Sequence, residues 1–244
     1  ADRAKFYADP QVEKNLPIAE MISKPYAKRQ AKRIDMAKAA LRVPAGDPRL
    51  AKGDTIYLTA VDKERNVVSL IQSNFYGFGS GHVPGNLGFA MQNRGTLFTM
   101  DENHHNRLEP NKRPFHTIIP AMVTRDGKPF LSFGVMGGDM QPQGHSQVLV
   151  NIIDHGMNVQ EASDAGRVRH DGSDTPTGDI MSDGGRLIVE SGVSDEAVKE
   201  LKKRGHNVTR GGAGGGYQAI RIDYETGLLH GGSEARKDGA AIGY

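Results

Sequence analysis

The chain has 244 residues, with 31 Lys and Arg against 29 Asp and Glu, and its formal net charge is +2. The absence of Cys excludes thiol catalysis, disulfides and thiolate metal sites. A charge so close to neutral argues against nucleic-acid binding, and the sequence contains neither a membrane-spanning apolar run nor a signal-peptide pattern. One large domain is the simplest expectation, although 31 glycines are nearly twice the usual share of about 7%.

The N-terminal part of the chain differs from the rest. Residues 1–54 contain 12 basic and 7 acidic residues, a net charge of +5, which leaves −3 for residues 55–244. The spacing predicts a helix over 25–41, whose basic residues we interpret as a solvated face. The polar stretch 43–48, with two prolines and a glycine, predicts an exposed linker.

From Thr55 onward the pattern predicts strands followed by helices. Two hairpins are expected, at 55–61 with 67–73 and at 117–124 with 129–135, the second marked by an Asp-Gly turn. Further helices are predicted over 143–157 and 159–165 and after the capping residue Ser194. Strands are predicted at 186–190 and 217–222. Hairpins combined with helices, without regular βαβ repeats, indicate a layered α+β fold.

The glycine-rich stretches form no G-x-G-x-x-G motif, so a dinucleotide site is not predicted. Gly137 and Gly138 follow an apolar strand and precede a helix, where amide groups can point at an oxyanion. A tight turn that only glycine tolerates explains the pair equally well. His104 and His105 are adjacent and therefore form a poor chelate, so no metal site is predicted.

Thr55 opens a strand directly after the polar linker. Cleavage before this residue would leave a free α-amine beside its own hydroxyl, and such an amine can act as the general base for that hydroxyl. A purely structural threonine at the start of a strand is the alternative. No G-x-S-x-G elbow is present to indicate a serine nucleophile.

Five elements in order resemble the γ-glutamyltransferase family of N-terminal nucleophile hydrolases. They are the run 53–62, Phe78-Gly79-Ser80-Gly81, Pro110-Asn111-Lys112-Arg113-Pro114, Gly137-Gly138 and Gly243-Tyr244. The resemblance covers essentially the whole chain and implies an α+β fold, a four-layer αββα sandwich. It divides the chain into 1–54, the C-terminal tail of a large subunit with a linker, and 55–244, a small catalytic subunit.

The resemblance also implies roles for particular residues. Thr55 would attack the carbonyl of Asp54, cleave the chain between them, and then serve as the catalytic nucleophile on a γ-acyl amide. Ser73 occupies the position of a second hydroxyl that hydrogen-bonds the nucleophile, and Gly137 and Gly138 occupy the positions of the oxyanion donors. No cofactor and no metal are implied. The acyl group would pass to water, an amino acid or a peptide.

The substrate-binding positions depart from the family pattern. Counting without gaps, they fall on Phe75, Arg94, Leu97, and the pair His116 and Thr117. A cationic Arg94 suits a carboxylate rather than an ammonium group. We therefore expect poor activity on glutathione and a preference for an acyl group without the α-amine, as in glutaryl or cephalosporin acylases.

Two alternatives stay open at this point. One is a glutaryl or cephalosporin-type acylase on the same fold, and the other is a catalytically silent homologue that acts as a binding domain. The resemblance further implies several hundred residues before Ala1, so the remainder of a large subunit is an expected partner. Any targeting signal would lie there, and the compartment is undetermined.

Overall fold

We analysed a computed structural model that describes residues 2–42, 54–173, 175–178 and 180–244. The predicted linker at 43–48 lies outside the described residues. The centre of the fold is an antiparallel sheet with the strand order β3-β4-β8-β9. Its strands are β3 (Ala121–Arg125), β4 (Lys128–Val135), β8 (Tyr217–Ile222) and β9 (Leu229–Ser233).

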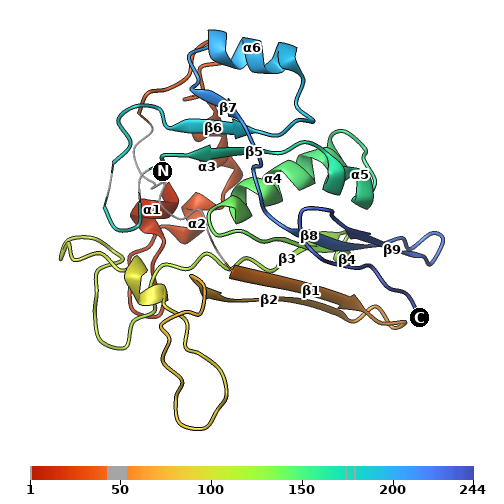
Figure 1. The fold of residues 1–244 in the computed structure, drawn as a ribbon, viewed down its shortest axis with the longest axis horizontal. Coiled ribbons are helices and arrows are strands. Elements are labelled where there is room, and N and C mark those ends of the chain that lie inside the picture. Colours follow the sequence, from red (N-terminus) through yellow and green to blue (C-terminus); the bar gives the residue numbers. More distant parts are fainter. Residues whose placement is uncertain (1, 43–53, 174, 179) are drawn as a thin grey trace.

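Helices cover one face of this sheet and a β-hairpin covers the other (Figure 1). The helices are α4 (Met140–Ile153) and α5 (Val159–Asp164), and the hairpin strands are β1 (Asp54–Val61) and β2 (Val67–Phe75). Under the helices, Leu131 and Phe133 of β4 pack with Val148 of α4. Under the hairpin, Tyr57 and Ile71 pack with Met136. The layers follow from alternating apolar positions, which bury both faces of β4.

A second sheet contains β5 (Val168–Asp171), β6 (Arg186–Val189) and β7 (Val208–Arg210). Helix α6 (Asp195–Lys203) packs on it through Val198. The predicted cap is confirmed, since the Ser194 Oγ accepts a hydrogen bond of 3.2 Å from the Ala197 amide. Strand β8 matches its prediction, whereas β5, β7 and β9 were not predicted because they are short and lack clear alternation.

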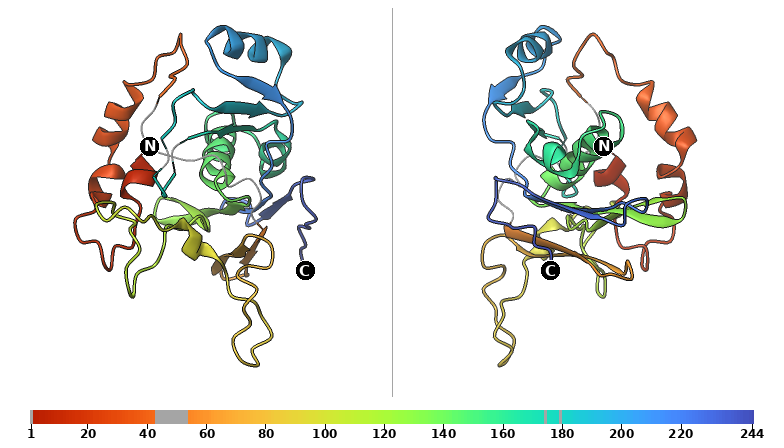
Figure 2. Two further views of the ribbon diagram at one scale, coloured as in Figure 1. Left: turned by 60° about the vertical axis from the view of Figure 1, so that its left-hand side comes forward. Right: turned by 90° about the vertical axis from the view of Figure 1, so that its right-hand side faces the viewer.

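The N-terminal segment contains α1 (Asp2–Phe6), α2 (Ile18–Met21) and α3 (Lys24–Ala31) and runs along one side of the molecule (Figure 2). The predicted helix over 25–41 is wrong beyond Ala31. Residues further on instead pair with distant backbone, because the Ala39 amide donates to the Arg204 carbonyl and the Leu41 carbonyl accepts from Gly184, both at 2.7 Å. Tertiary hydrogen bonds thus outweigh helix propensity here.

Other predicted boundaries differ as well: the helix predicted over 143–157 ends at Ile153, and the strand predicted over 67–73 continues to Phe75. Two differences at the starts of elements lie near the site described below. Helix α4 begins at Met140, three residues earlier than expected. Strand β3 begins at Ala121 rather than at Thr117, because the preceding residues bond to side chains of α4. The Ile119 amide donates to the Gln141 side chain at 3.0 Å, and the Ile119 carbonyl lies 3.0 Å from Nε2 of His145.

Candidate active site

The hairpin β1–β2 places the two predicted hydroxyl residues side by side. Thr55 is the register partner of Ser73, and an irregularity next to it pairs Asp54 with Phe75. Directly opposed residues of an antiparallel pair have Cβ atoms about 4.5–5.5 Å apart. Thr55 is buried, with 6% of its surface exposed. The side chain of Asp54 lies outside the described residues.

The irregularity in β2 is stabilised by Ser73 itself. Its Oγ accepts a hydrogen bond of 2.9 Å from the Phe75 amide. Phe75 has a φ of +79°, a left-handed conformation that is unusual for a side chain of this size. The hydroxyl of Ser73 therefore holds the backbone bend opposite the Asp54–Thr55 bond, and that bend turns the chain toward Arg94.

The packing of β1 on β4 brings Thr55 to the end of β4. The hydroxyls of Thr59 and Ser132 are 2.6 Å apart, and the ring of Tyr57 lies against Gly134, where a Cβ would come within 2.4 Å of it. Side chains on one face of a strand recur every second residue. Thr55 is the next residue on this face, so it lies over the end of β4, where Gly137 and Gly138 follow.

Gly137 and Gly138 form the turn from β4 into α4. Their φ angles are +109° and +58°, and a Cβ on Gly137 would lie 3.2 Å from the Cα of Gly215. Their carbonyls accept the first hydrogen bonds of α4, from the amides of Met140 and Gln141. The amides of the two glycines donate to no other described residue. The geometry is therefore consistent with both interpretations of the pair. It is a turn that only glycine tolerates, and it also provides two available amide donors near a helix N-terminus.

Arg94 lies in a four-residue 3₁₀ helix, η1 (Arg94–Leu97), at the end of a long projecting loop (Figure 1). Arg94 is 1% exposed, and its guanidinium donates a hydrogen bond of 2.8 Å from Nη1 to the Thr117 hydroxyl and stacks 5.0 Å from the centre of the Phe75 ring. Its Nε and Nη2 have no partner among the described residues. Burial lowers the pKa of Arg94 to about 10, so the group stays cationic at neutral pH.

His116 belongs to the same cluster. Burial, together with the nearby cations Arg94 and Arg113, lowers the pKa of His116 to about 4. Its Nδ1 accepts a hydrogen bond of 3.2 Å from the Ile118 amide, as expected for a neutral imidazole. We call Phe75, Arg94, His116 and Thr117 the Arg94 cluster. The structure thus brings these four predicted residues together, whereas Leu97 packs beneath them with Phe75 and Phe115.

A buried ion network that no sequence pattern indicated holds the loop 211–216 against Gly137. Arg167 donates 2.6 Å to the Gly215 carbonyl and pairs with Glu234 at 2.9 Å, and Arg236 bridges Glu234 and Glu190. These four residues come from distant parts of the chain. No local sequence pattern could have indicated them, because a single charged residue in a sequence predicts a solvent-exposed position.

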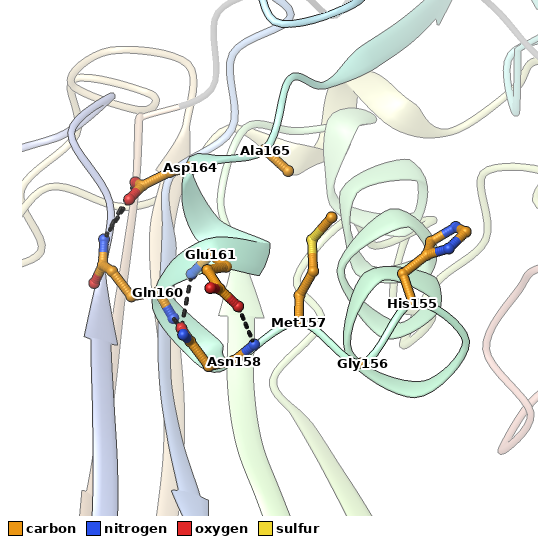
Figure 3. A pocket seen from close by; sticks show the side chains of 8 residues that line it. All are labelled: His155, Gly156, Met157, Asn158, Gln160, Glu161, Asp164 and Ala165. Atoms are coloured by element: carbon orange, nitrogen blue, oxygen red, sulfur yellow. Dashed lines mark hydrogen bonds between the residues drawn. The ribbon is translucent and has the colours of Figure 1, made fainter.

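One open hollow of about 650 Å³ lies at the turn between α4 and α5 (Figure 3). The polar side chains between residues 158 and 164 that line it are engaged locally, since Asn158 caps α5, Glu161 accepts from the Asn158 amide, and Gln160 bonds Asp164. The central sheet separates α4 and α5 from the hairpin that carries Thr55 (Figure 1). This hollow is therefore not part of the site around Thr55.

The described part of the chain contains no group of three His, Asp or Glu side chains that could hold a metal ion. Among the same residues, no helix combines the length and apolarity required to cross a membrane.

Comparisons with known proteins place this geometry in a family. Residues 1–244 match the gamma-glutamyltranspeptidase family model. The chain is 38% identical to the glutathione hydrolase-like YwrD proenzyme of Bacillus subtilis, over 99% of this chain and 44% of that protein. It is 32% identical to the oxamate amidohydrolase proenzyme of Klebsiella pneumoniae, over 79% of this chain and 36% of that protein.

Among solved structures, the chain is similar to the cephalosporin acylase of Bacillus halodurans, with a TM-score of 0.82 and 38% identity. The match covers 99% of this chain and 42% of that one, so the chain spans less than half the length of these relatives. The fold is the α+β fold of N-terminal nucleophile hydrolases. Its full-length match to the family model and its similarity to these proenzymes show that the chain belongs to the gamma-glutamyltranspeptidase family.

Proposed function

We propose that this chain carries the catalytic centre of a threonine-nucleophile amide hydrolase or acyltransferase, with Thr55 as nucleophile. One observation carries the proposal: buried Thr55 lies opposite Ser73 and over the end of β4, where the amides of Gly137 and Gly138 are available. A nucleophile, a neighbouring hydroxyl and a pair of backbone donors are the components that acyl transfer requires.

Maturation comes first. The Thr55 hydroxyl attacks the carbonyl of Asp54, the acyl group moves from nitrogen to oxygen, and water hydrolyses the resulting ester. This frees the α-amine of Thr55 and yields two chains, 1–54 as the end of a large subunit and 55–244 as a small subunit. The proenzyme names of the relatives support this step.

The mature site then transfers an acyl group. The α-amine of Thr55 takes the hydroxyl proton, the oxygen attacks the substrate amide, and Gly137 and Gly138 stabilise the negative charge on the carbonyl oxygen. The leaving amine receives the proton, and an ester to Thr55 forms. Water, or the amine of an amino acid or peptide, releases the acyl group and restores the hydroxyl. Ser73 orients the Thr55 oxygen.

For the substrate, we propose an acyl group that carries a carboxylate and lacks an α-amine. The guanidinium of Arg94 has two buried nitrogens, Nε and Nη2, without partners among the described residues, and a carboxylate is the acceptor that fits such a fork. Phe75 and neutral His116 offer no anion to hold an ammonium group. The similarity to an oxamate amidohydrolase supports this preference, because oxamate joins a carboxylate to an amide and has no α-amine.

Mass spectrometry of the full-length product tests the cleavage. We expect two chains that meet between Asp54 and Thr55 in the wild type and in a Thr55→Ser variant, and one intact chain in Thr55→Ala. Cleavage at the same bond in Thr55→Ala would exclude Thr55 as the nucleophile. A wild-type chain that stays intact on prolonged incubation would instead indicate a silent homologue.

Matched anilides test the substrate class. We expect faster release of p-nitroaniline from the glutaryl anilide than from the γ-glutamyl anilide, which differs only by the α-amine. Thr55→Ala should abolish both reactions. Faster turnover of the γ-glutamyl compound would contradict the assignment to Arg94 and leave a glutathione hydrolase as the better description.

A further inference from the structure

Two acidic residues of the N-terminal segment form ion pairs with Lys112 and Arg113. These two basic residues belong to the irregular stretch 105–118 before β3, which we call the element. Asp9 and Glu13 lie just after α1, more than 90 residues before their partners in sequence. We call Asp9, Glu13, Lys112 and Arg113 the N-terminal ion cluster. It joins the two sides of the proposed cleavage point.

The first pair is nearly saturated with hydrogen bonds. Asp9, whose side chain is 2% exposed, accepts 3.1 Å bonds from the Arg113 amide and Nε and a 2.9 Å bond from Nη2. The Gln11 amide donates a fourth bond at 3.0 Å. The hydrogen bonds from Arg113 hold the pKa of Asp9 well below its usual range, so the carboxylate stays charged. This geometry fixes both the side chain and the backbone of Arg113.

The second pair surrounds a buried ammonium group. The Lys112 side chain is fully buried, and its Nζ donates to the His105 carbonyl at 2.7 Å, to Glu109 at 2.9 Å and to Glu13 at 3.2 Å. All three donor positions of the ammonium are thus used, one of them by the N-terminal segment. Without Glu13, Lys112 would retain a buried charge with an unsatisfied donor.

The element fixed by this cluster continues directly into the Arg94 cluster. His116 and Thr117 follow Arg113 after two residues, and the intervening Phe115 is 1% exposed and packs on Phe75. The N-terminal segment also contacts Phe115, with Tyr7 edge-to-face at 5.3 Å and the Arg3 guanidinium 4.8 Å from the ring centre. Segment 3–13 therefore supports the position of the Thr117 hydroxyl that Arg94 bonds.

We propose that Asp9 and Glu13 are positioning residues for the acyl site: through Arg113 and Lys112 they hold His116 and Thr117 where Arg94 can receive a carboxylate. The inference rests on the proposed function. It assigns to the N-terminal segment, which cleavage would separate from the small subunit, a lasting part in substrate selection. The segment contributes no reacting atom, and its effect is on the geometry of the Arg94 cluster.

Kinetics on two anilides distinguish positioning from general support of the fold. In Asp9→Asn and Glu13→Gln, we expect KM for the glutaryl anilide to rise about tenfold with kcat changed less than about twofold. KM for the valeryl anilide, which lacks the carboxylate, should not change. Glu20→Gln is the matched control, because Glu20 also forms an ion pair in the N-terminal segment, with Arg29 at an exposed position. Equal changes for both substrates would overturn the proposal.

Hydrogen exchange provides a readout that does not need turnover. In a Thr55→Ala background of the full-length protein, Asp9→Asn should speed exchange in peptides covering 113–118 by about tenfold, with no effect from Glu20→Gln. Unchanged exchange would overturn the proposal even if the enzyme is active. If the wild type hydrolyses neither anilide, the proposed function fails, and the exchange result still decides whether the cluster holds this element.

Discussion

Replacing Arg94 with methionine should stabilise the protein while it removes substrate selection. Methionine has a similar length and no charge, so Arg94→Met keeps the packing on Phe75 and removes the buried cation. The guanidinium has one hydrogen bond, to Thr117, and its Nε and Nη2 nitrogens have no partners among the described residues. A buried cation with unpaired donors lowers the stability of the fold, and this arrangement is typical of a residue that binds a ligand.

The size of the effect follows from the pKa of Arg94. A decrease from the ordinary arginine value of 12.5 to about 10 corresponds to about 3.5 kcal/mol of folding free energy, because one pKa unit is about 1.4 kcal/mol. The hydrogen bond to Thr117 and the stacking on Phe75 offset about 2 kcal/mol of this cost. The free energy of unfolding should therefore rise by about 1.5 kcal/mol in Arg94→Met, which raises Tm by about 3–6 °C.

Activity should change in the opposite direction. A charged hydrogen bond to a substrate carboxylate contributes about 1.5–3 kcal/mol, so kcat/KM for the glutaryl anilide should fall about 10- to 100-fold. The valeryl anilide should be hydrolysed as before. Thermal unfolding and steady-state kinetics on the same preparation measure both effects.

Two outcomes would refute this reasoning. If Arg94 instead stabilised the fold, its replacement would lower the free energy of unfolding by about 1–3 kcal/mol, the cost of losing its hydrogen bond to Thr117 and its stacking on Phe75. If the carboxylate of the acyl group bound elsewhere, kcat/KM for the glutaryl anilide would stay unchanged. Arg29→Met, at an exposed ion pair remote from the site, is the control for the loss of a positive charge.

Three further predictions concern the same site. Gly137→Ala should lower kcat about 10²- to 10³-fold and the free energy of unfolding by about 1–3 kcal/mol, because of its φ of +109° and its contact with Gly215. Ser73→Ala should lower kcat about 10- to 100-fold with little change in KM. As pH falls from 6.5 to about 4, the free energy of unfolding should decrease by about 1–2 kcal/mol. In this range the imidazole of His116 is protonated in the unfolded chain but stays neutral in the folded protein, because folding lowers its pKa to about 4.

Each of these has a direct check. Gly127→Ala, at a positive φ in an open turn, should lose stability but keep kcat, and an equal loss of kcat in both variants would contradict the oxyanion role of Gly137. Wild-type kcat in Ser73→Ala would exclude an orienting hydroxyl. For the pH effect, urea unfolding of His116→Gln should show a flatter dependence between pH 6.5 and 4, and an unchanged profile would exclude His116 as its source.

Several elements were predictable because their signals are local. Strand β8 and the cap at Ser194 follow from alternation and from a hydroxyl before an acidic first turn. The helix predicted over 25–41 ends at Ala31, and further along Ala39 and Leu41 bond to Arg204 and Gly184, which no local pattern reveals. The short strands β5 and β7 form only because β6 lies between them.

The sequence by itself determined where β1 and β2 run and hence that Thr55 and Ser73 meet, because a short hairpin fixes register through neighbouring residues. The sequence also indicated Arg94, but only because a cationic residue at that substrate-binding position departs from the family pattern. Tertiary structure decided that Arg94 lies on Phe75 beside Thr117, and that Asp9 holds Arg113 across 104 residues. Contacts between distant segments depend on how whole layers pack, and periodicity along the chain carries no information about that packing.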